Sequence, residues 1–367
     1  MEKKKELGGL LDILPPVDFC CSYGSSLLPN NNDKSSMVDY IIGVSDPLQW
    51  HDQNLKMNRN HYASWMMQFG GAKVITGIAE SIGVGVHFNP YVTWEDKVLI
   101  FQLIGMRTLS YVWKCNKVYH VNPIISLFLT GGTQMVKYGV VRMHNLVHDL
   151  LNWESFYLSG RLQKPVHILA DSIDIENLNL NNLRAATSTA LLLLPSEFSE
   201  EDLYAKICSL SYMGDLRMFF AEDKNKVKRI VQGQFDLFQK SYKPFVDEYA
   251  AKDLLRFSSS SDPKVQIAQD CALPATRSLV SSLPSSVRSG MGMRLGDEVK
   301  VSDSGRVIRE VVIGSREETV DCLRKVLRRK VMVSSARQAF AGLLSAGAVN
   351  SAQYLTRKMG KALKSWM

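Results

Sequence analysis

Two short stretches decide how we interpret this chain: Tyr23-Gly24-Ser25-Ser26 and Ser36-Met37-Val38-Asp39-Tyr40-Ile41-Ile42-Gly43-Val44. The first is a turn of small residues after a short apolar run, so it predicts the end of a buried strand. The second predicts another buried strand, because most of its residues are apolar or β-branched, yet it carries a carboxylate at Asp39. A buried, unpaired aspartate is costly unless it binds something. We therefore expect Asp39 and the turn to belong to a ligand site.

The turn is suited to holding phosphate groups. Gly24 has no side chain, so backbone N–H groups around it can come close to phosphate oxygens, and Ser25 adds a hydroxyl donor. Tyr23 and Ser26 flank these two residues and belong to the same candidate site. For the turn taken alone, an ordinary β-turn before a buried strand is the alternative interpretation.

Asp39 is the strongest candidate metal ligand. Many nucleotidyltransferases place two acids at alternate positions of one strand, where both point to one face and hold Mg²⁺. Here the alternate positions hold Met37 and Ile41, so a second carboxylate must come from elsewhere. Asp46 and Asp149 are the candidates. Ordinary roles stay open for both: Asp46 precedes a proline and fits a cap of the next turn, and Asp149 fits a solvent-facing or salt-bridged helix residue.

Basic residues at three positions extend the candidate site. Arg161 and Lys164 follow Gly160 in a turn at a predicted helix end, where they can grip a polyphosphate or a phospholipid head group. The equally simple alternative is that these charges complement a helix dipole. Lys137 is a similar case.

Histidines and glycine motifs add no further site. His51 and His61 are ten residues apart and match no metal signature, which favours structural histidines. Gly83-Val84-Gly85 lacks the third glycine of a dinucleotide fingerprint. The sequence also shows no P-loop and no catalytic Ser/His/Asp order.

Composition bounds the class of protein. The chain has 367 residues, 46% of them hydrophobic and 22% charged, which is ordinary for a globular protein with two domains and a tail. The net charge of +8 is concentrated at one end: Arg324 to Met367 holds ten Lys or Arg and no Asp or Glu, so the rest carries 34 basic and 36 acidic groups.

The six cysteines form no CxxC pair, which fits a reducing compartment. Val118–Val136 is broken by Asn122-Pro123 and Gly131-Gly132, so we expect no transmembrane helix there.

The hydrophobic pattern predicts an α/β (α+β) first part and a mostly helical second part, with domain limits at residues 1–177, 178–300 and 301–367. In the first part we expect strands at Met37–Val44, Gly83–Val92 and Val136–Met143 and helices at Trp50–Trp65, Gly70–Ser81 and Leu146–Leu158. In the second we expect helices at Leu178–Leu194 and Lys226–Ala250, and a capped helix start at Ser199-Glu200-Glu201-Asp202. The Ser/Pro-rich Ala272–Gly296 predicts loops or linkers.

The C-terminal stretch predicts a basic amphipathic helix. At helical spacing one face holds apolar residues and the opposite face basic ones: Leu355, Met359, Leu363 and Trp366 against Arg357, Lys361 and Lys364. Such a helix suits an anionic membrane surface, where each nearby basic residue adds ~1 kcal/mol of attraction. The alternative is a C-terminal helix that packs on the core with a solvated basic face.

Together these residues resemble the mitochondrial phosphatidate cytidylyltransferases, the peripheral CDP-diacylglycerol synthases also called translocator assembly and maintenance proteins. The resemblance covers most of the chain and lies in five blocks: Tyr23-Gly24-Ser25 with Met37-Val38-Asp39; Trp50-His51 through Asn60-His61-Tyr62; Lys137-Tyr138-Gly139-Val140; Asp149-Leu150 through Gly160-Arg161-Leu162-Gln163-Lys164-Pro165-Val166; and Ser199-Glu200-Glu201-Asp202-Leu203 with Gly214-Asp215-Arg217-Met218. The block that begins at Gly160 is specific.

The resemblance implies a nucleotidyltransferase-fold domain with a mixed sheet, a winged-helix-like domain, and a C-terminal segment that docks on the matrix face of the inner mitochondrial membrane. It also implies Mg²⁺-dependent transfer of CMP from CTP to phosphatidic acid, with release of pyrophosphate, on the path to cardiolipin. On this basis roles are assigned as follows: Asp39, Lys164 and Arg161 to catalysis; Tyr23, Gly24, Ser25, Ser26 and Lys137 to nucleotide binding; and Asp39, Asp46 and Asp149 to the metal.

Two features depart from the family pattern. Ser26 stands where family members have glycine. The stretch from about Lys97 to Met135 is an atypical apolar insert, unusually long for a loop inside a compact domain. Retained non-coding sequence in the gene model is our hypothesis for its origin.

Two other classes of function stay open. One is a nucleotidyltransferase that acts on a nucleic acid, whose phosphates the basic tail would bind. The other is a non-catalytic membrane scaffold, which the missing acid beside Asp39 would fit. If the chain is a phosphatidate cytidylyltransferase, as the resemblance implies, we expect no nucleic-acid partner. The sequence does not indicate an oligomeric state.

Overall fold

The computed structural model describes residues 7–29, 37–103, 112–114, 125–215, 225–257, 266–301 and 307–364. Only the backbone is described at 25, 91, 94–103, 112–114, 125–134, 300–301, 307–308 and 346–364. Among the helices in these ranges, none combines the length and the apolar character needed to cross a bilayer.

A six-stranded mixed sheet forms the centre of the first domain, with strand order β4-β3-β5-β2-β1-β6. The strands are β1 (Phe19–Tyr23), β2 (Val38–Val44), β3 (Val86–Leu103), β4 (Val112–Lys114), β5 (Ile125–Arg142) and β6 (His167–Asp171). Strands β2 and β5 are parallel, and the other neighbours are antiparallel. The sheet confirms the predicted mixed α/β fold.

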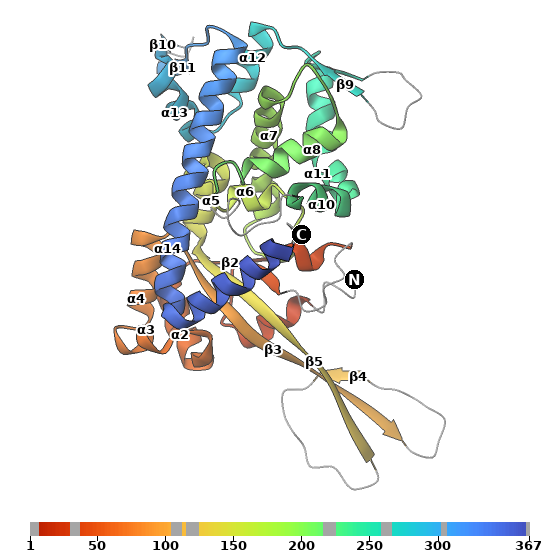
Figure 1. Ribbon diagram of the computed structural model, residues 1–367, viewed down its shortest axis with the longest axis vertical. Coiled ribbons are helices and arrows are strands. Elements are labelled where there is room, and N and C mark those ends of the chain that lie inside the picture. The colour runs from red at the N-terminus through yellow and green to blue at the C-terminus, as the bar shows by residue number, and fades with distance from the viewer. Residues whose placement is uncertain are drawn as a thin grey trace.

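Short helices surround this sheet (Figure 1). They are η1 (Gly9–Ile13), η2 (Ser25–Leu27), α2 (Pro47–Met57), η3 (Arg59–His61), α3 (Ser64–Gln68), α4 (Ala72–Gly77), η4 (Ile78–Ile82), α5 (Met143–Asn152) and α6 (Ser159–Leu162). The helix predicted over Trp50–Trp65 is therefore interrupted, because α2 ends at Met57 and α3 begins at Ser64.

The two faces of the sheet bury separate apolar clusters, because successive side chains of a strand point to opposite faces. Tyr40 and Ile42 of β2 belong to the cluster that contains Trp50 of α2. Ile41 belongs to the other cluster, with Leu146 of α5. Asp39 is two residues before Ile41 and shares its face, so the carboxylate lies on the side covered by α5 and α6.

The helix predicted over Leu146–Leu158 is wrong beyond Asn152. Helix α5 ends there, and Trp153 adopts a left-handed backbone conformation with φ of +54°. The chain then turns back so that Asp149 accepts hydrogen bonds from backbone N–H groups of the next loop. An aspartate near a helix end can thus stop a helix whose apolar spacing continues.

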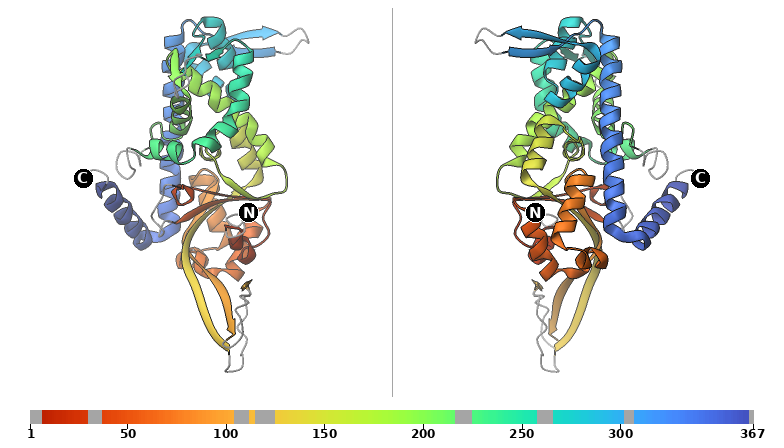
Figure 2. Two further views of the ribbon diagram at one scale, coloured as in Figure 1. Left: turned by 90° about the vertical axis from the view of Figure 1, so that its right-hand side faces the viewer. Right: turned by 90° about the vertical axis from the view of Figure 1, so that its left-hand side faces the viewer.

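Strands β3 and β5 run through the segment predicted as an atypical insert, 97–135. Their antiparallel pairing begins with Val86 and Val141, shifts register between Asn89 and Val92, and continues to Leu103 with Ile125. Figures 1 and 2 show the two strands projecting from the rest of the domain. The described backbone of the insert is therefore a hairpin extension of the sheet, not a loop, and 104–111 and 115–124 lie outside the described residues. The origin of the insert stays a hypothesis.

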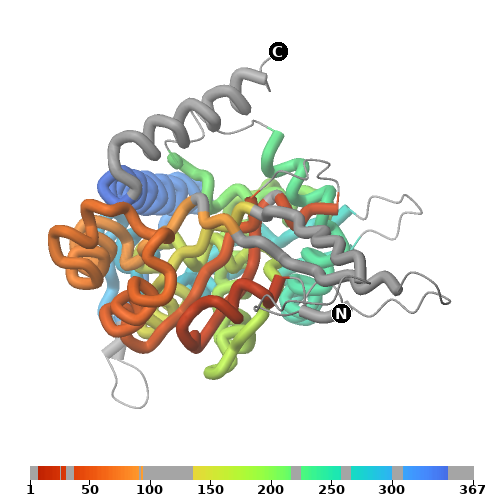
Figure 3. The backbone as a smooth tube through the Cα atoms, turned by 90° about the horizontal axis from the view of Figure 1, so that it is seen from below, coloured from red at the N-terminus to blue at the C-terminus, as the bar shows by residue number. Residues whose placement is uncertain are grey.

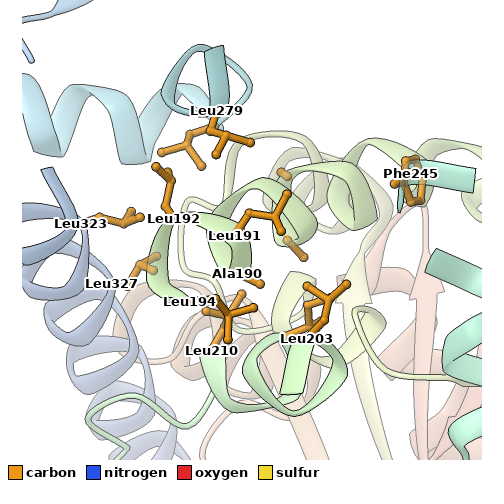
Figure 4. Close-up of a cluster of buried hydrophobic side chains, with 14 of the residues drawn as sticks. Ala190, Leu191, Leu192, Leu194, Leu203, Leu210, Phe245, Leu279, Leu323 and Leu327 are labelled. Carbon is orange, nitrogen blue, oxygen red and sulfur yellow. The ribbon is translucent and has the colours of Figure 1, made fainter. Parts of the chain in front are cut away.

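The second domain is mostly helical. Its elements are α7 (Ile175–Leu193), β7 (Glu197–Ser199), α8 (Glu200–Leu210), α10 (Lys226–Gly233), α11 (Phe235–Ala251), β8 (Leu255–Phe257), β9 (Gln266–Gln269), α12 (Leu273–Ser281), α13 (Ser285–Leu295), β10 (Asp297–Val301) and β11 (Val307–Val311). Strands β7, β9 and β8 form a small antiparallel sheet, and Figure 4 shows the apolar core. Ser199 caps α8 through a reciprocal bond with Asp202, which confirms the predicted helix start. The winged-helix-like comparison stays a prediction.

The prediction of loops over Ala272–Gly296 is wrong, because this segment forms α12 and α13. Proline is favoured at the beginning of helices, and here Pro274 and Pro284 mark the two starts. Leu279 and Val287 are buried in the domain core. The prolines that suggested a linker therefore belong to helix starts, and the serines lie within the two helices or at their ends.

One long helix, α14 (Arg316–Lys364), connects the two domains. Leu323 and Leu327 are buried in the core of the helical domain, so the first part of the region predicted as separate, 301–367, belongs to this core. Further along, Arg337 donates to the carbonyl of Ile82, and Ala341 joins an apolar cluster with Met66. Figure 1 shows α14 passing from one domain to the other, and Figure 3, in which this helix is seen end-on in blue, shows it beside the orange helices of the first domain. Of the predicted amphipathic helix, the backbone to Lys364 is helical, and Trp366 lies outside the described residues.

Candidate active site

The site is built where β1 ends beside the beginning of β2. Tyr23 pairs with Asp39 in the antiparallel ladder, and Gly24 follows with φ of +109°, a conformation that favours glycine. A Cβ atom on Gly24 would lie 2.9 Å from Oδ2 of Asp39. The structure therefore brings the turn and the carboxylate together, and only glycine allows this approach.

The turn after Gly24 closes through a hydrogen bond from the N–H of Leu27 to the Gly24 carbonyl, 3.3 Å long. The Ser26 hydroxyl is buried and has no hydrogen-bond partner among the described residues. Buried polar atoms in proteins nearly always have a partner, so an orphaned hydroxyl in a candidate phosphate turn indicates a place for a ligand oxygen. Ser25 lies in η2, and its side chain lies outside the description.

Lys137 lies beside Asp39 in the parallel pairing of β2 and β5. Directly paired residues of neighbouring strands share a face, so the lysine and the carboxylate extend to the same side of the sheet. The Lys137 Nζ atom lies 4.4 Å from the centre of the Phe88 ring. A cation over an aromatic face is stabilised by the ring, so Lys137 adds a positive charge to the same face of the sheet as Asp39.

Arg161 of α6 lies over two aromatic rings of the same face. Its Nη2 donates to the Tyr157 hydroxyl at 2.7 Å, and its Cζ lies 4.1 Å from the Tyr157 ring and 5.5 Å from the Tyr23 ring. Burial raises the pKa of Tyr23, with Arg161 acting to lower it and Asp39 to raise it. Because Tyr23 pairs with Asp39 and its ring lies under the Arg161 guanidinium, Arg161 lies close to the Asp39 site.

Lys164 lies at the junction of the two domains. Its Nζ donates to the Gly160 carbonyl at 2.6 Å and to Oγ of Ser211 at 2.7 Å, and lies 4.9 Å from the centre of the Tyr212 ring. Burial lowers the pKa of Lys164 to about 8, helped by the positive charges of Arg161 and Lys226 and opposed by Cys208.

Sequence reasoning missed the residues that the helical domain contributes. Ser211 and Tyr212 follow α8, and Lys226 begins α10, with its Nζ also 4.9 Å from the centre of the Tyr212 ring. The only sequence signal near them was the block that begins at Gly214. None of these residue types is unusual at its position, so only the docking of the domains shows their relation to Lys164.

Asp46 has a structural role at the other end of β2. Its carboxylate caps α2 by accepting from the N–H groups of Leu48 at 2.9 Å and Gln49 at 3.4 Å. Since a strand rises about 3.3 Å per residue, Asp46 is roughly 20 Å from Asp39 along the chain direction. The two carboxylates therefore cannot hold the same ion, which corrects the assignment of Asp46 to the metal.

Asp149 also has a different role from the predicted one. Both oxygens accept backbone N–H groups at 2.7–3.0 Å: Ser155 and Phe156 on Oδ1, Leu158 and Ser159 on Oδ2. The carboxylate is 4% exposed, and hydroxyls of Ser155 and Ser159 add to the same set. An anion saturated in this way has no lone pair directed to a metal, so Asp149 orders the loop that leads into α6.

The described residues contain no group of three or more His, Cys, Asp or Glu side chains that could hold a metal ion. A cage made of protein ligands alone is therefore absent from this part of the chain. Mg²⁺ is commonly held by one or two carboxylates together with substrate phosphates. Asp39, close to a turn with an orphaned hydroxyl, fits an ion that arrives with a nucleotide.

His51 and His61 lie on the opposite face of the sheet, in a buried hydrogen-bond network. Nδ1 of His51 lies 2.9 Å from the Tyr62 hydroxyl and Nδ1 of His61 lies 2.8 Å from the Tyr138 hydroxyl, while Asn54 donates to both tyrosines. Burial lowers the pKa of His61 to about 4 and that of His51 well below its usual value. The prediction of structural histidines is confirmed.

The chain is similar to known proteins over almost its whole length. A family model described as "Phosphatidate cytidylyltransferase, mitochondrial" matches residues 7–361. Proteins of that name from Mus musculus and Danio rerio are each 30% identical to this chain over 96% of its length, covering 92% and 93% of the relatives. The Caenorhabditis elegans protein of that name is 29% identical over the whole of both chains.

Proposed function

The chain belongs to the mitochondrial phosphatidate cytidylyltransferase family, and we propose that it transfers CMP from CTP to phosphatidic acid. The products are CDP-diacylglycerol and pyrophosphate. The observation that carries the proposal is the contact of Gly24 with Asp39, next to the cations of Lys137 and Arg161. A carboxylate, a phosphate-binding turn and fixed positive charges are what phosphoryl-type transfer needs.

The residues act by positioning and charge stabilisation. The Gly24–Leu27 turn offers backbone N–H groups and the Ser26 hydroxyl to the nucleotide phosphates, and Lys137 and Arg161 stabilise the negative charge that develops on them. Asp39 is the residue that would hold Mg²⁺, which, when bound, neutralises charge on the phosphates.

The bond changes need no nucleophile from the protein. An oxygen of the phosphatidic acid phosphate attacks the α-phosphorus in line and forms the new P–O bond. The bond from the α-phosphorus to the oxygen that bridges to the β-phosphate breaks, and pyrophosphate leaves with that electron pair. The attacking oxygen already carries negative charge, so no general base has to remove a proton.

We propose a peripheral location on the matrix side of the inner mitochondrial membrane, on the path to cardiolipin. Its support is the mitochondrial name of the relatives and the basic end of the chain, with ten Lys or Arg and no acidic residue from Arg324. The substrate lipid stays in the bilayer, and none of the helices among the described residues could cross it, so docking at the membrane surface would bring the site to the lipid. The C-terminal part of α14 is the segment we assign to that docking.

The direct test is an assay with radiolabelled CTP, phosphatidic acid liposomes and Mg²⁺. The wild-type chain should form labelled lipid, and Asp39→Asn should lower kcat by about 100-fold or more, as loss of a charge-stabilising group at a reacting centre does. Asp46→Asn is the matched control, because asparagine still caps a helix. Absence of lipid product from the wild-type chain would rule against the proposed activity, and equal rates for wild type and Asp39→Asn would remove the metal-ligand assignment.

A further inference from the structure

Two aromatic rings lie against the two cations of the proposed site. The Lys137 Nζ atom lies 4.4 Å from the centre of the Phe88 ring, and Cζ of Arg161 lies 4.1 Å from the centre of the Tyr157 ring. The two rings also contact each other edge to face, with 6.3 Å between their centres. Phe88 and Tyr157, the aromatic pair, therefore connect two cations that come from β5 and α6.

The aromatic pair is fixed by packing. Phe88 is 9% exposed and Tyr157 is 7% exposed, and both belong to the apolar cluster that contains Ile41. Phe88 lies opposite Gly139 in the pairing of β3 and β5, and a Cβ on this glycine would lie 2.5 Å from Cε1 of Phe88. A side chain at residue 139 would therefore displace the ring. The position of the ring under Lys137 depends on a glycine two residues further along the same strand.

Tyr157 holds Arg161 in two ways. Its ring lies under the guanidinium group, and its hydroxyl accepts a hydrogen bond of 2.7 Å from Nη2 of Arg161. Long basic side chains lose much rotamer freedom when they are fixed. A side chain that the folded protein already holds in place does not lose this freedom when the substrate binds. An aromatic ring can do this without neutralising the cation, because the ring carries no net charge.

We propose that Phe88 and Tyr157 are positioning residues for the transfer: they hold Lys137 and Arg161 where negative charge develops on the phosphate groups of CTP. The proposal rests on the proposed function and deepens it, because charge stabilisation at a reacting centre requires groups that are already in place before the reaction. The rings act through the two cations and need no contact with the substrate.

The first test removes the rings. Phe88→Leu keeps a large apolar side chain and removes the ring under Lys137. With Mg²⁺ and phosphatidic acid liposomes, kcat/KM for CTP should fall about 10- to 100-fold, and most of the loss should be in kcat. Tyr157→Phe keeps the ring and loses the hydroxyl, so kcat/KM should fall by about 3- to 10-fold. Tyr157→Leu loses both contacts and should be slower than Tyr157→Phe.

Double-mutant cycles separate positioning from packing. In a Lys137→Met chain there is no ammonium group left to position, so Phe88→Leu should lose most of its effect on kcat/KM. For the same reason, Tyr157→Leu should lose most of its effect in an Arg161→Met chain. If Phe88→Leu lowers kcat/KM by the same factor with and without the Lys137 ammonium group, the ring acts only in packing and the proposal is overturned.

Phe19→Leu is the matched control for the loss of a buried ring. Phe19 is 0% exposed and belongs to the same apolar cluster as Phe88, and no cation lies over its ring among the contacts of the described residues. In urea unfolding, Phe19→Leu should lower stability at least as much as Phe88→Leu, yet it should leave kcat/KM unchanged. An equal loss of kcat/KM in the two variants would overturn the positioning role of Phe88.

Binding of CTP with Mg²⁺, measured without lipid, distinguishes failure of this proposal from failure of the proposed function. Phe88→Leu should weaken this binding by about 3- to 10-fold in the wild-type background and much less in Lys137→Met. A wild-type chain that shows this pattern but forms no lipid product contradicts the proposed function and supports the positioning role. Equal affinity in wild type and Phe88→Leu, or no binding of CTP by the wild-type chain, overturns the positioning role.

Discussion

Replacing Gly24 with alanine is the most direct test of the reasoning about the site. The glycine has φ of +109°, a conformation that costs a residue with a side chain on the order of 1–3 kcal/mol. The added methyl group would also lie 2.9 Å from Oδ2 of Asp39, closer than such atoms normally approach. Either the turn or the carboxylate must move, and both belong to the proposed nucleotide site.

For Gly24→Ala, the expected loss of stability is too small to explain the expected loss of activity by unfolding. A loss of about 1–3 kcal/mol leaves a protein of ordinary stability, about 5–15 kcal/mol, almost fully folded. Activity, however, should fall by about 100-fold, because displacements of about 1 Å at a reacting centre have effects of that size. Urea unfolding gives the first quantity, and kcat/KM with CTP and phosphatidic acid liposomes gives the second.

Gly77→Ala is the control for the loss of a glycine. Gly77 lies in α4, is exposed, and a Cβ there would meet no atom within 4 Å. Its replacement should leave activity unchanged and should raise stability by up to ~1 kcal/mol, because alanine favours helix. Wild-type kcat/KM in Gly24→Ala would refute the placement of the turn against Asp39.

Two further predictions concern residues whose roles the structure defines. Asp149→Ala should destabilise the protein by about 3 kcal/mol or more in urea unfolding, because it leaves several buried N–H groups of the next loop without an acceptor; unchanged stability with a weakened Mg²⁺ dependence would instead support a metal ligand. Lys164, with a pKa of about 8, loses its proton as the pH rises through that value, so phosphate affinity should fall above pH 8, with roughly a tenth of the molecules still charged at pH 9. In the unfolded chain this lysine has a pKa of 10.5, so between about pH 8 and pH 10.5 the unfolded state binds more protons than the folded state. The free energy of unfolding should therefore rise with pH over this range. Lys164→Arg, which stays charged, should abolish both dependences, and a pH profile unchanged in that variant would contradict the assignment.

Features that depend on neighbouring residues were predictable from the sequence. The capping box at Ser199 and Asp202 follows from a spacing of three residues, and the strand around Asp39 follows from its run of β-branched and aromatic residues. The same local reasoning failed where one side chain had a distant effect. The apolar spacing of α5 continues to Leu158, but Asp149 takes the N–H groups of the next loop, so the helix ends at Asn152.

The sequence by itself determined the family blocks, the glycine turn and the carboxylate of Asp39, because each can be recognised from the residue types at neighbouring positions. Only the tertiary structure decided that Asp46 and Asp149 are structural, since that depends on where their oxygens point. It also decided that Lys226 lies at the same ring as Lys164. These two lysines are far apart in the chain, and the packing of α6 against the end of α8 that brings them together leaves no periodic signal in the sequence.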